Sequence, residues 1–126
     1  MEIPKQLQDR LTQYQSVQNQ LQMIMAQKQH LMLASADTEN ALKELGKAGD
    51  GRVYKMAGTL LIETTKDASQ KELSEAKETG EARITVIEKQ EKKLRDKFEE
   101  MRKEISAMLG DHASSGASGG SDSGDQ

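Results

Sequence analysis

The sequence contains no cysteine and no tryptophan, and it has a single proline. Without cysteine, the chain can form no disulfide framework and can use no thiolate as a nucleophile. Aromatic residues make up only 2% and hydrophobic residues 34% of the 126 residues, which is less than a compact globule of this length buries. We therefore expect an elongated helical protein with a thin core, because a 31% share of charged residues is typical of long, solvent-exposed helices.

Long apolar runs are also missing. The N-terminal sequence lacks the apolar run of a signal peptide, and no stretch approaches the roughly 18 apolar residues of a membrane span. The formal net charge is −3, whereas nucleic-acid binders usually carry a basic stripe. We expect a soluble, cytoplasmic protein that binds neither membranes nor nucleic acids.

Two segments repeat apolar residues with the alternating three- and four-residue spacing of a coiled coil. The first predicts a helix over residues 4–45. Pro4 suits its first turn, and Gly46 is expected to end it. Leu11, Met25 and Met32 widen the apolar stripe beside the seam. The seam positions hold Leu7, Arg10, Tyr14, Val17, Leu21, Ile24, Lys28, Leu31, Ser35, Thr38, Leu42 and Leu45.

The second repeat predicts a helix over residues 67–109. Asp67 and Gln70 have the spacing of a capping box at its start. Gly80 at a seam position costs about 1 kcal/mol relative to alanine and marks a soft spot. The seam holds Leu73, Lys77, Gly80, Ile84, Ile87, Glu91, Leu94, Phe98, Met101, Ile105 and Met108.

The region between the helices, residues 46–66, is expected to form a short β-hairpin. Glycines break the helix, and β-branched and apolar residues follow on both sides of a glycine-containing turn. Tyr54, Met56, Leu60 and Ile62 are expected on one face, with Val53 and Leu61 on the other. A lone hairpin is marginal in water, so we expect these six residues to assemble with the hairpins of other subunits.

The hairpin turns the chain back, so the fold class is a long antiparallel two-helix coiled coil. Both seams end together near the termini, where an apolar surface is expected to stay partly open, as at many interaction sites. The residues at this end are Ile3, Leu7, Leu11, Tyr14, Leu94, Phe98, Met101, Ile105, Met108 and Leu109. The domain covers residues 1–109, and residues 110–126, rich in Gly and Ser, are expected to be a disordered tail.

Catalysis and cofactor binding find little support in the sequence. His30 and His112 are the only histidines, no ligand cluster surrounds either, and the carboxylates alternate with lysines and arginines as on a solvated face. A phosphate-binding loop is missing, so ATP-driven cycling is not expected. A structural coiled-coil scaffold or adaptor is the alternative function. A scaffold would explain the heptads but not the hairpin or the open end. An enzyme is the third and least favoured class of function.

The order of helix, glycine break, hairpin and helix resembles the archaeal prefoldin beta subunit over residues 1–109. The most specific parts are Val53–Lys55, the Thr64-Thr65-Lys66-Asp67 entry into the second helix and Glu88–Glu91. The resemblance implies a hexamer of two alpha and four beta subunits whose hairpins form a β-barrel platform. It also implies that the open ends bind unfolded client proteins without ATP and pass them to a group II chaperonin. Gly80 departs from the family pattern, which has a large apolar residue there.

Overall fold

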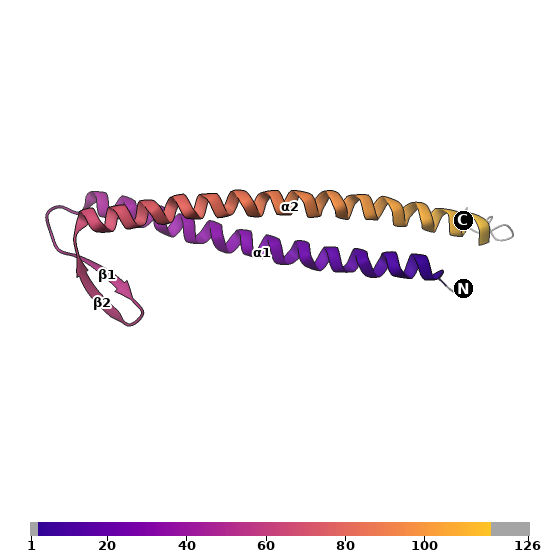
Figure 1. The fold of residues 1–126 in the computed structure, drawn as a ribbon, viewed down its shortest axis with the longest axis horizontal. Coiled ribbons are helices and arrows are strands. Elements are labelled where there is room, and N and C mark those ends of the chain that lie inside the picture. Colours follow the sequence, from indigo (N-terminus) through magenta and orange to yellow (C-terminus); the bar gives the residue numbers. More distant parts are fainter. Residues whose placement is uncertain (1–2, 117–126) are drawn as a thin grey trace, which may run out of the picture. The chain divides into compact units, whose positions relative to one another are not determined.

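The computed structural model describes residues 3–116 of the chain. Its elements follow in the order α1 (Lys5–Lys47), β1 (Val53–Ala57), β2 (Leu60–Thr64) and α2 (Lys66–Gly116) (Figure 1). The two long helices and the antiparallel hairpin between them confirm the predicted fold class.

Each helix contributes to two compact units. The first, called here the terminal unit, combines Met1–Ile24 with Gln90–Gln126. The second, called the hairpin unit, comprises Met25–Lys89 and contains the whole β-hairpin. The two candidate interaction surfaces of the sequence analysis therefore fall into different units.

Helix α1 begins one residue after its predicted start at residue 4 and ends two residues after its predicted end at residue 45. The carbonyl of Pro4 accepts a hydrogen bond from the N–H of Gln8 at 2.9 Å, so Pro4 precedes the first helical residue. The helix passes through Gly46 and ends at Lys47, so the prediction that Gly46 stops it is wrong. One glycine destabilises a helix by only about 1 kcal/mol relative to alanine. The last turn of α1 still forms, with hydrogen bonds from the N–H of Ala48 to the carbonyls of Glu44 and Leu45.

Helix α2 is capped by Thr65 and not by the predicted residue, Asp67. The hydroxyl of Thr65 accepts a hydrogen bond from the N–H of Ala68 at 3.1 Å, which makes Thr65 the N-cap. The predicted capping box of Asp67 and Gln70 is therefore wrong. Asp67 lies instead in the first turn, where its carboxylate is favourable beside the positive end of the helix dipole.

The C-terminal end of α2 also lies beyond its predicted position. The helix continues to Gly116, so residues 110–116 of the predicted tail are helical. Extending an existing helix adds one backbone hydrogen bond for each residue ordered, and this offsets much of the low helix propensity of glycine and serine. Residues 117–126 of the predicted tail lie outside the described residues.

The predicted heptad seam holds the core of each unit. All predicted seam positions on both helices are buried or half-buried, except Arg10, which is exposed. Alternating three- and four-residue spacing keeps these side chains on the side that faces the partner helix. The buried apolar residues are Leu7, Val17, Leu21, Met101 and Ile105 in the terminal unit, and Leu45 and Ile87 in the hairpin unit.

Within the hairpin unit, the helices run antiparallel. The Lys66 ammonium at the start of α2 donates a hydrogen bond to the carbonyl of Ala48, just after the end of α1, at 2.8 Å. Eleven residues further along α2, Lys77 forms an ion pair at 3.8 Å with Glu39, nine residues back from Ala48. The helices are also antiparallel in the terminal unit.

Candidate interaction surfaces

The β-hairpin has a different apolar surface on each face. Its register pairs Met56 with Leu61 and Lys55 with Ile62, and paired residues share a face. One face therefore carries Tyr54, Met56 and Leu61, and the other carries Val53, Leu60 and Ile62 with Lys55. The predicted division of these residues between the faces is wrong.

The hairpin turn explains this difference. Gly58 and Thr59 connect the strands, and Gly58 has a φ of 62°, which glycine adopts without steric cost. A two-residue turn pairs positions three apart, such as Ala57 and Leu60. Even-numbered residues of β1 therefore share a face with odd-numbered residues of β2, which the alternation within each strand does not reveal.

The predicted assembly residues are largely exposed. Met56 is 74% and Leu61 67% exposed, Tyr54, Leu60 and Ile62 are also exposed, and Val53 is half-buried. Within the described chain, each strand is paired only with the other, so both outer edges have unpaired backbone groups. Exposed apolar side chains on a two-stranded sheet with open edges are typical of a surface that pairs with another chain.

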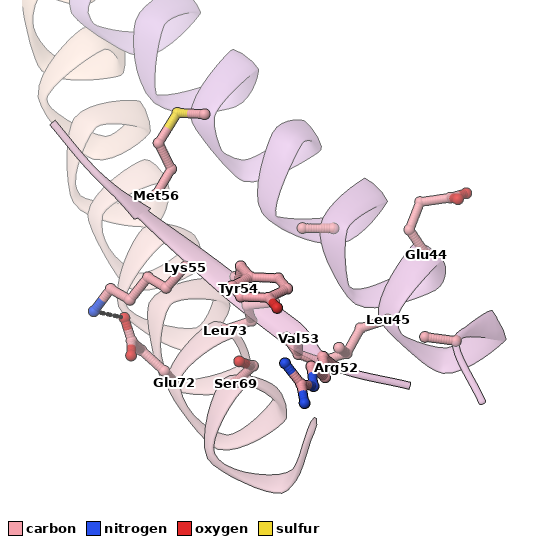
Figure 2. A pocket seen from close by; sticks show the side chains of 12 residues that line it. Glu44, Leu45, Arg52, Val53, Tyr54, Lys55, Met56, Ser69, Glu72 and Leu73 are labelled. Carbon is pink, nitrogen blue, oxygen red and sulfur yellow. Dashed lines mark ion pairs between the residues drawn. The ribbon is translucent and has the colours of Figure 1, made fainter. Parts of the chain in front are cut away.

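A cavity of about 510 Å³ lies between the hairpin and the adjoining ends of the two helices (Figure 2). Lys55 of β1 crosses one side of this region and forms an ion pair with Glu72 of α2 at 2.6 Å. The cavity is lined by Ala41, Glu44, Leu45, Ala48, Arg52, Val53, Tyr54, Lys55, Met56, Ser69, Glu72 and Leu73. Sequence reasoning missed the ion pair, because it depends on how the hairpin is oriented against α2.

In the terminal unit, direct contacts fix how the two helices pair. The rings of Tyr14 and Phe98 stack with centroids 4.4 Å apart and an angle of 11° between their planes. One turn earlier on α1, Arg10 forms an ion pair at 3.3 Å with Glu104, further along α2. The helices therefore run antiparallel here too, and the ring stack adds to the burial of the seam.

The predicted open end is more closed than expected. Leu7 is only 1% exposed, and Met101 and Ile105 are also buried, so these three residues offer no surface in this structure. Tyr14 against Phe98 places Leu7 near Ile105, seven residues away on each helix, so the seam continues toward the chain ends.

The other seven predicted residues at this end of the helices are exposed or half-buried, and they form its accessible apolar surface. Ile3 is 43% and Leu109 47% exposed. The half-buried residues show only part of their side chains at the flanks of the seam; these are Leu11, Tyr14, Leu94, Phe98 and Met108. The structure thus divides the predicted set into a buried core, half-buried flanks and two exposed ends.

Charged side chains in the terminal unit are paired locally along α2. Glu91, buried at a seam position, accepts hydrogen bonds from Arg95 at 2.8 and 3.2 Å. Such a partner reduces the cost of removing the carboxylate from water. Glu99 accepts a hydrogen bond from Arg102 at 2.6 Å, and this bond lowers the pKa of the Glu99 carboxyl. These contacts are structural and form no catalytic constellation.

Among residues 3–116, no group of three or more His, Cys, Asp or Glu side chains is arranged to hold a metal ion. In the part of the chain that the structure describes, neither helix has the length and hydropathy that crossing a membrane requires.

A family model and several related proteins all match the chain to prefoldin subunits. A family model described as "Prefoldin subunit" matches residues 8–112. The prefoldin subunit beta of Thermococcus kodakarensis is 43% identical over 108 residues, which cover 85% of this chain and 92% of the relative. The prefoldin subunit beta of Archaeoglobus fulgidus is 40% identical over 113 residues, covering 89% and 97% of the two chains.

Solved structures agree with these relatives. The crystal structure of the prefoldin beta subunit from Thermococcus strain KS-1 matches with a TM-score of 0.78 at 42% identity. The match covers 86% of this chain and 96% of that chain. The beta2 subunit from the same strain has a TM-score of 0.65 at 23% identity, a likeness of fold alone.

Proposed function

The chain belongs to the prefoldin family of chaperones, and we propose that it is a beta-type subunit that holds unfolded proteins without ATP. The observation that carries the proposal is a pair of apolar surfaces in separate units. One is the exposed hairpin, and the other is formed by the helix ends near both termini. In this proposal, the hairpin assembles subunits and the helix ends bind clients.

The assembly surface consists of Val53, Tyr54, Met56, Leu60, Leu61 and Ile62. Their exposure on both faces of a two-stranded sheet supports burial against other hairpins, because such a hairpin gains stability only by adding strands or packing partners. We propose alpha subunits and further beta subunits as these partners. The family arrangement of two alpha and four beta subunits around a β-barrel platform fits this surface.

The client surface begins with the two exposed ends, Ile3 and Leu109. The half-buried flank residues enlarge it, and Leu7 becomes available where the start of α1 frays, whereas Met101 and Ile105 lie further from the end of α2 and stay buried in the seam. Each such contact is weak. Several subunits on one platform raise the effective concentration of binding surfaces, so weak contacts together retain a client.

Release follows from the same weak contacts. A protein that binds unfolded chains opposes their folding for as long as it holds them, so it must hand them over. We propose a group II chaperonin as the recipient. The sequence has no phosphate-binding loop of the common type, and dissociation from weak sites requires no nucleotide.

Suppression of client aggregation by the assembled complex tests the client surface. Ile3→Ser with Leu109→Ser removes the exposed ends, and we expect the affinity for an unfolded client to fall about fivefold or more. Met23→Gln is the matched control, because Met23 is an exposed apolar residue of the same unit outside the predicted set. The oligomer mass should stay unchanged in both variants. Full protection by the double variant would show that clients bind elsewhere.

A further inference from the structure

The hairpin has different connections to the two helices. Only Thr65 lies between the end of β2 and the start of α2, whereas residues 48–52, including Gly49 and Gly51, connect α1 to β1. A one-residue junction keeps the hairpin next to α2 but permits rotation about the backbone bonds of that residue. The glycine-containing segment on the other side restrains this rotation little.

An ion pair supplies a second attachment between the hairpin and α2. The ammonium of Lys55 lies 2.6 Å from the carboxylate of Glu72, and both side chains are about half exposed. Lys55 is paired with Ile62 in the hairpin register, and Glu72 lies almost two helical turns into α2. A junction at Thr65 and a contact at Glu72 together restrict rotation of the hairpin about the junction.

This contact also distinguishes the two hairpin faces. The side chain of Lys55 leaves the face that carries Ile62, so this face is directed toward Glu72. Met56 projects from the opposite face, and Figure 2 shows the two side chains leaving β1 in different directions. The ion pair therefore holds the face with Lys55 and Ile62 toward Glu72.

A third contact joins the two helix ends from which the hairpin extends. The ammonium of Lys66, the first residue of α2, donates a hydrogen bond to the carbonyl of Ala48 at 2.8 Å in a part-buried position. A cation is favourable at the carbonyl end of a helix, so Lys66 ties the end of α1 to the start of α2. The helix end to which the hairpin is attached is thereby fixed within the hairpin unit.

We propose that Lys55 and Glu72 are positioning residues for assembly, which orient the hairpin before a second prefoldin subunit binds. This inference rests on the proposed function of the hairpin as the assembly surface. A hairpin held in the binding orientation loses less conformational freedom on association, and this preorganisation strengthens binding without any new contact between subunits.

Charge reversal tests this inference. The quantity measured is the assembly midpoint, the concentration at which half of the chain is assembled with an archaeal prefoldin alpha subunit. Lys55→Glu places two carboxylates together, and we expect the assembly midpoint to rise about threefold or more. Adding Glu72→Lys restores an opposite-charge pair and should return the midpoint toward wild type. Lys71→Glu is the control, because it makes the same change in net charge at an exposed position of α2.

Salt concentration gives an independent reading. Screening weakens an exposed ion pair, so the difference between wild type and Lys55→Met should disappear in about 1 M salt. Equal midpoints for wild type and Lys55→Glu would overturn the inference but leave the assembly proposal intact. A wild-type chain that stays monomeric with the alpha subunit would instead refute the assembly proposal itself. Circular dichroism should show the same helix content in every variant.

Discussion

Replacing Gly80 should stabilise the hairpin unit, and this prediction tests how the seam is packed. Gly80 is half-buried in the first third of α2 and lies beside a hollow of about 360 Å³. A Cβ atom built on Gly80 meets no neighbouring atom within 4 Å. The hollow is lined by Leu31, Ala34, Ser35, Thr38, Glu75, Ala76, Thr79, Gly80 and Arg83.

The expected magnitude has two parts. Alanine in place of a helical glycine gains about 1 kcal/mol, because alanine loses less backbone freedom on folding. Leucine has nearly the same helix propensity as alanine, and burying about half of its side chain in the hollow adds roughly 1 kcal/mol. Gly80→Ala should therefore stabilise the chain by about 1 kcal/mol and Gly80→Leu by about 2 kcal/mol.

Urea unfolding followed by circular dichroism measures both effects at a fixed protein concentration, because assembly also contributes to apparent stability. With an m-value of about 2 kcal/mol/M, the midpoints should rise by roughly 0.5 M for alanine and 1 M for leucine. Gly110→Ala is a useful comparison, since Gly110 is also helical with no atom near an added Cβ. Its gain should be smaller, because helix ends fray.

Comparison of the leucine and alanine variants distinguishes a seam that is too narrow at residue 80 from a helix that is irregular there. A lower midpoint for Gly80→Leu with a higher one for Gly80→Ala would mean that the helices approach too closely for a large side chain. A lower midpoint for both would mean that residue 80 is not in a regular helix. Either result would refute the description of the seam as open beside Leu31.

Three further predictions concern packing and capping. Leu7→Ala should destabilise the chain by about 2–5 kcal/mol in urea unfolding, whereas Ile3→Ala should cost under about 0.5 kcal/mol, because only Leu7 is fully buried; equal costs would contradict the burial described here. A double-mutant cycle of Tyr14→Ala and Phe98→Ala should give a coupling energy of about 0.5–1.5 kcal/mol from the ring stack, and additive effects would disprove it. Thr65→Ala should cost about 1 kcal/mol of stability and Thr65→Ser much less, because serine keeps the capping hydroxyl; equal losses would exclude the cap.

The sequence predicted the helical seams well because their apolar spacing is a direct consequence of helix geometry. Leu7, Leu21, Ile87 and Met101 are buried where the heptads placed them. Even the polar seam residue Glu91 follows the pattern. Its burial shows that position in the heptad, more than residue type, decides which side chains face the partner helix.

Local choices at the element ends were harder to predict. Thr65 and Asp67 are both good N-cap residues, and two residues separate the alternatives. The division of the hairpin faces depends on whether the turn has an even or an odd number of residues, because one residue more or less in the turn exchanges the faces of one strand relative to the other. Such differences are set by backbone geometry and not by composition.

Contacts between elements were beyond sequence reasoning. Lys55 and Glu72 are two charged residues among many, and their pairing depends on the orientation of the hairpin against α2. The burial of Leu7 depends on how far the two seams stay together toward the chain ends. The sequence revealed an apolar end but not how much of it remains accessible.

We propose above all that this chain assembles through its hairpins and holds unfolded proteins without ATP. Native mass spectrometry of the chain mixed with an archaeal prefoldin alpha subunit, before and after addition of a chemically unfolded client, tests it most directly. We predict a hetero-oligomer that gains the mass of the client in nucleotide-free buffer. A chain that stays monomeric, or an oligomer that takes up the client only when ATP is added, would contradict the claim.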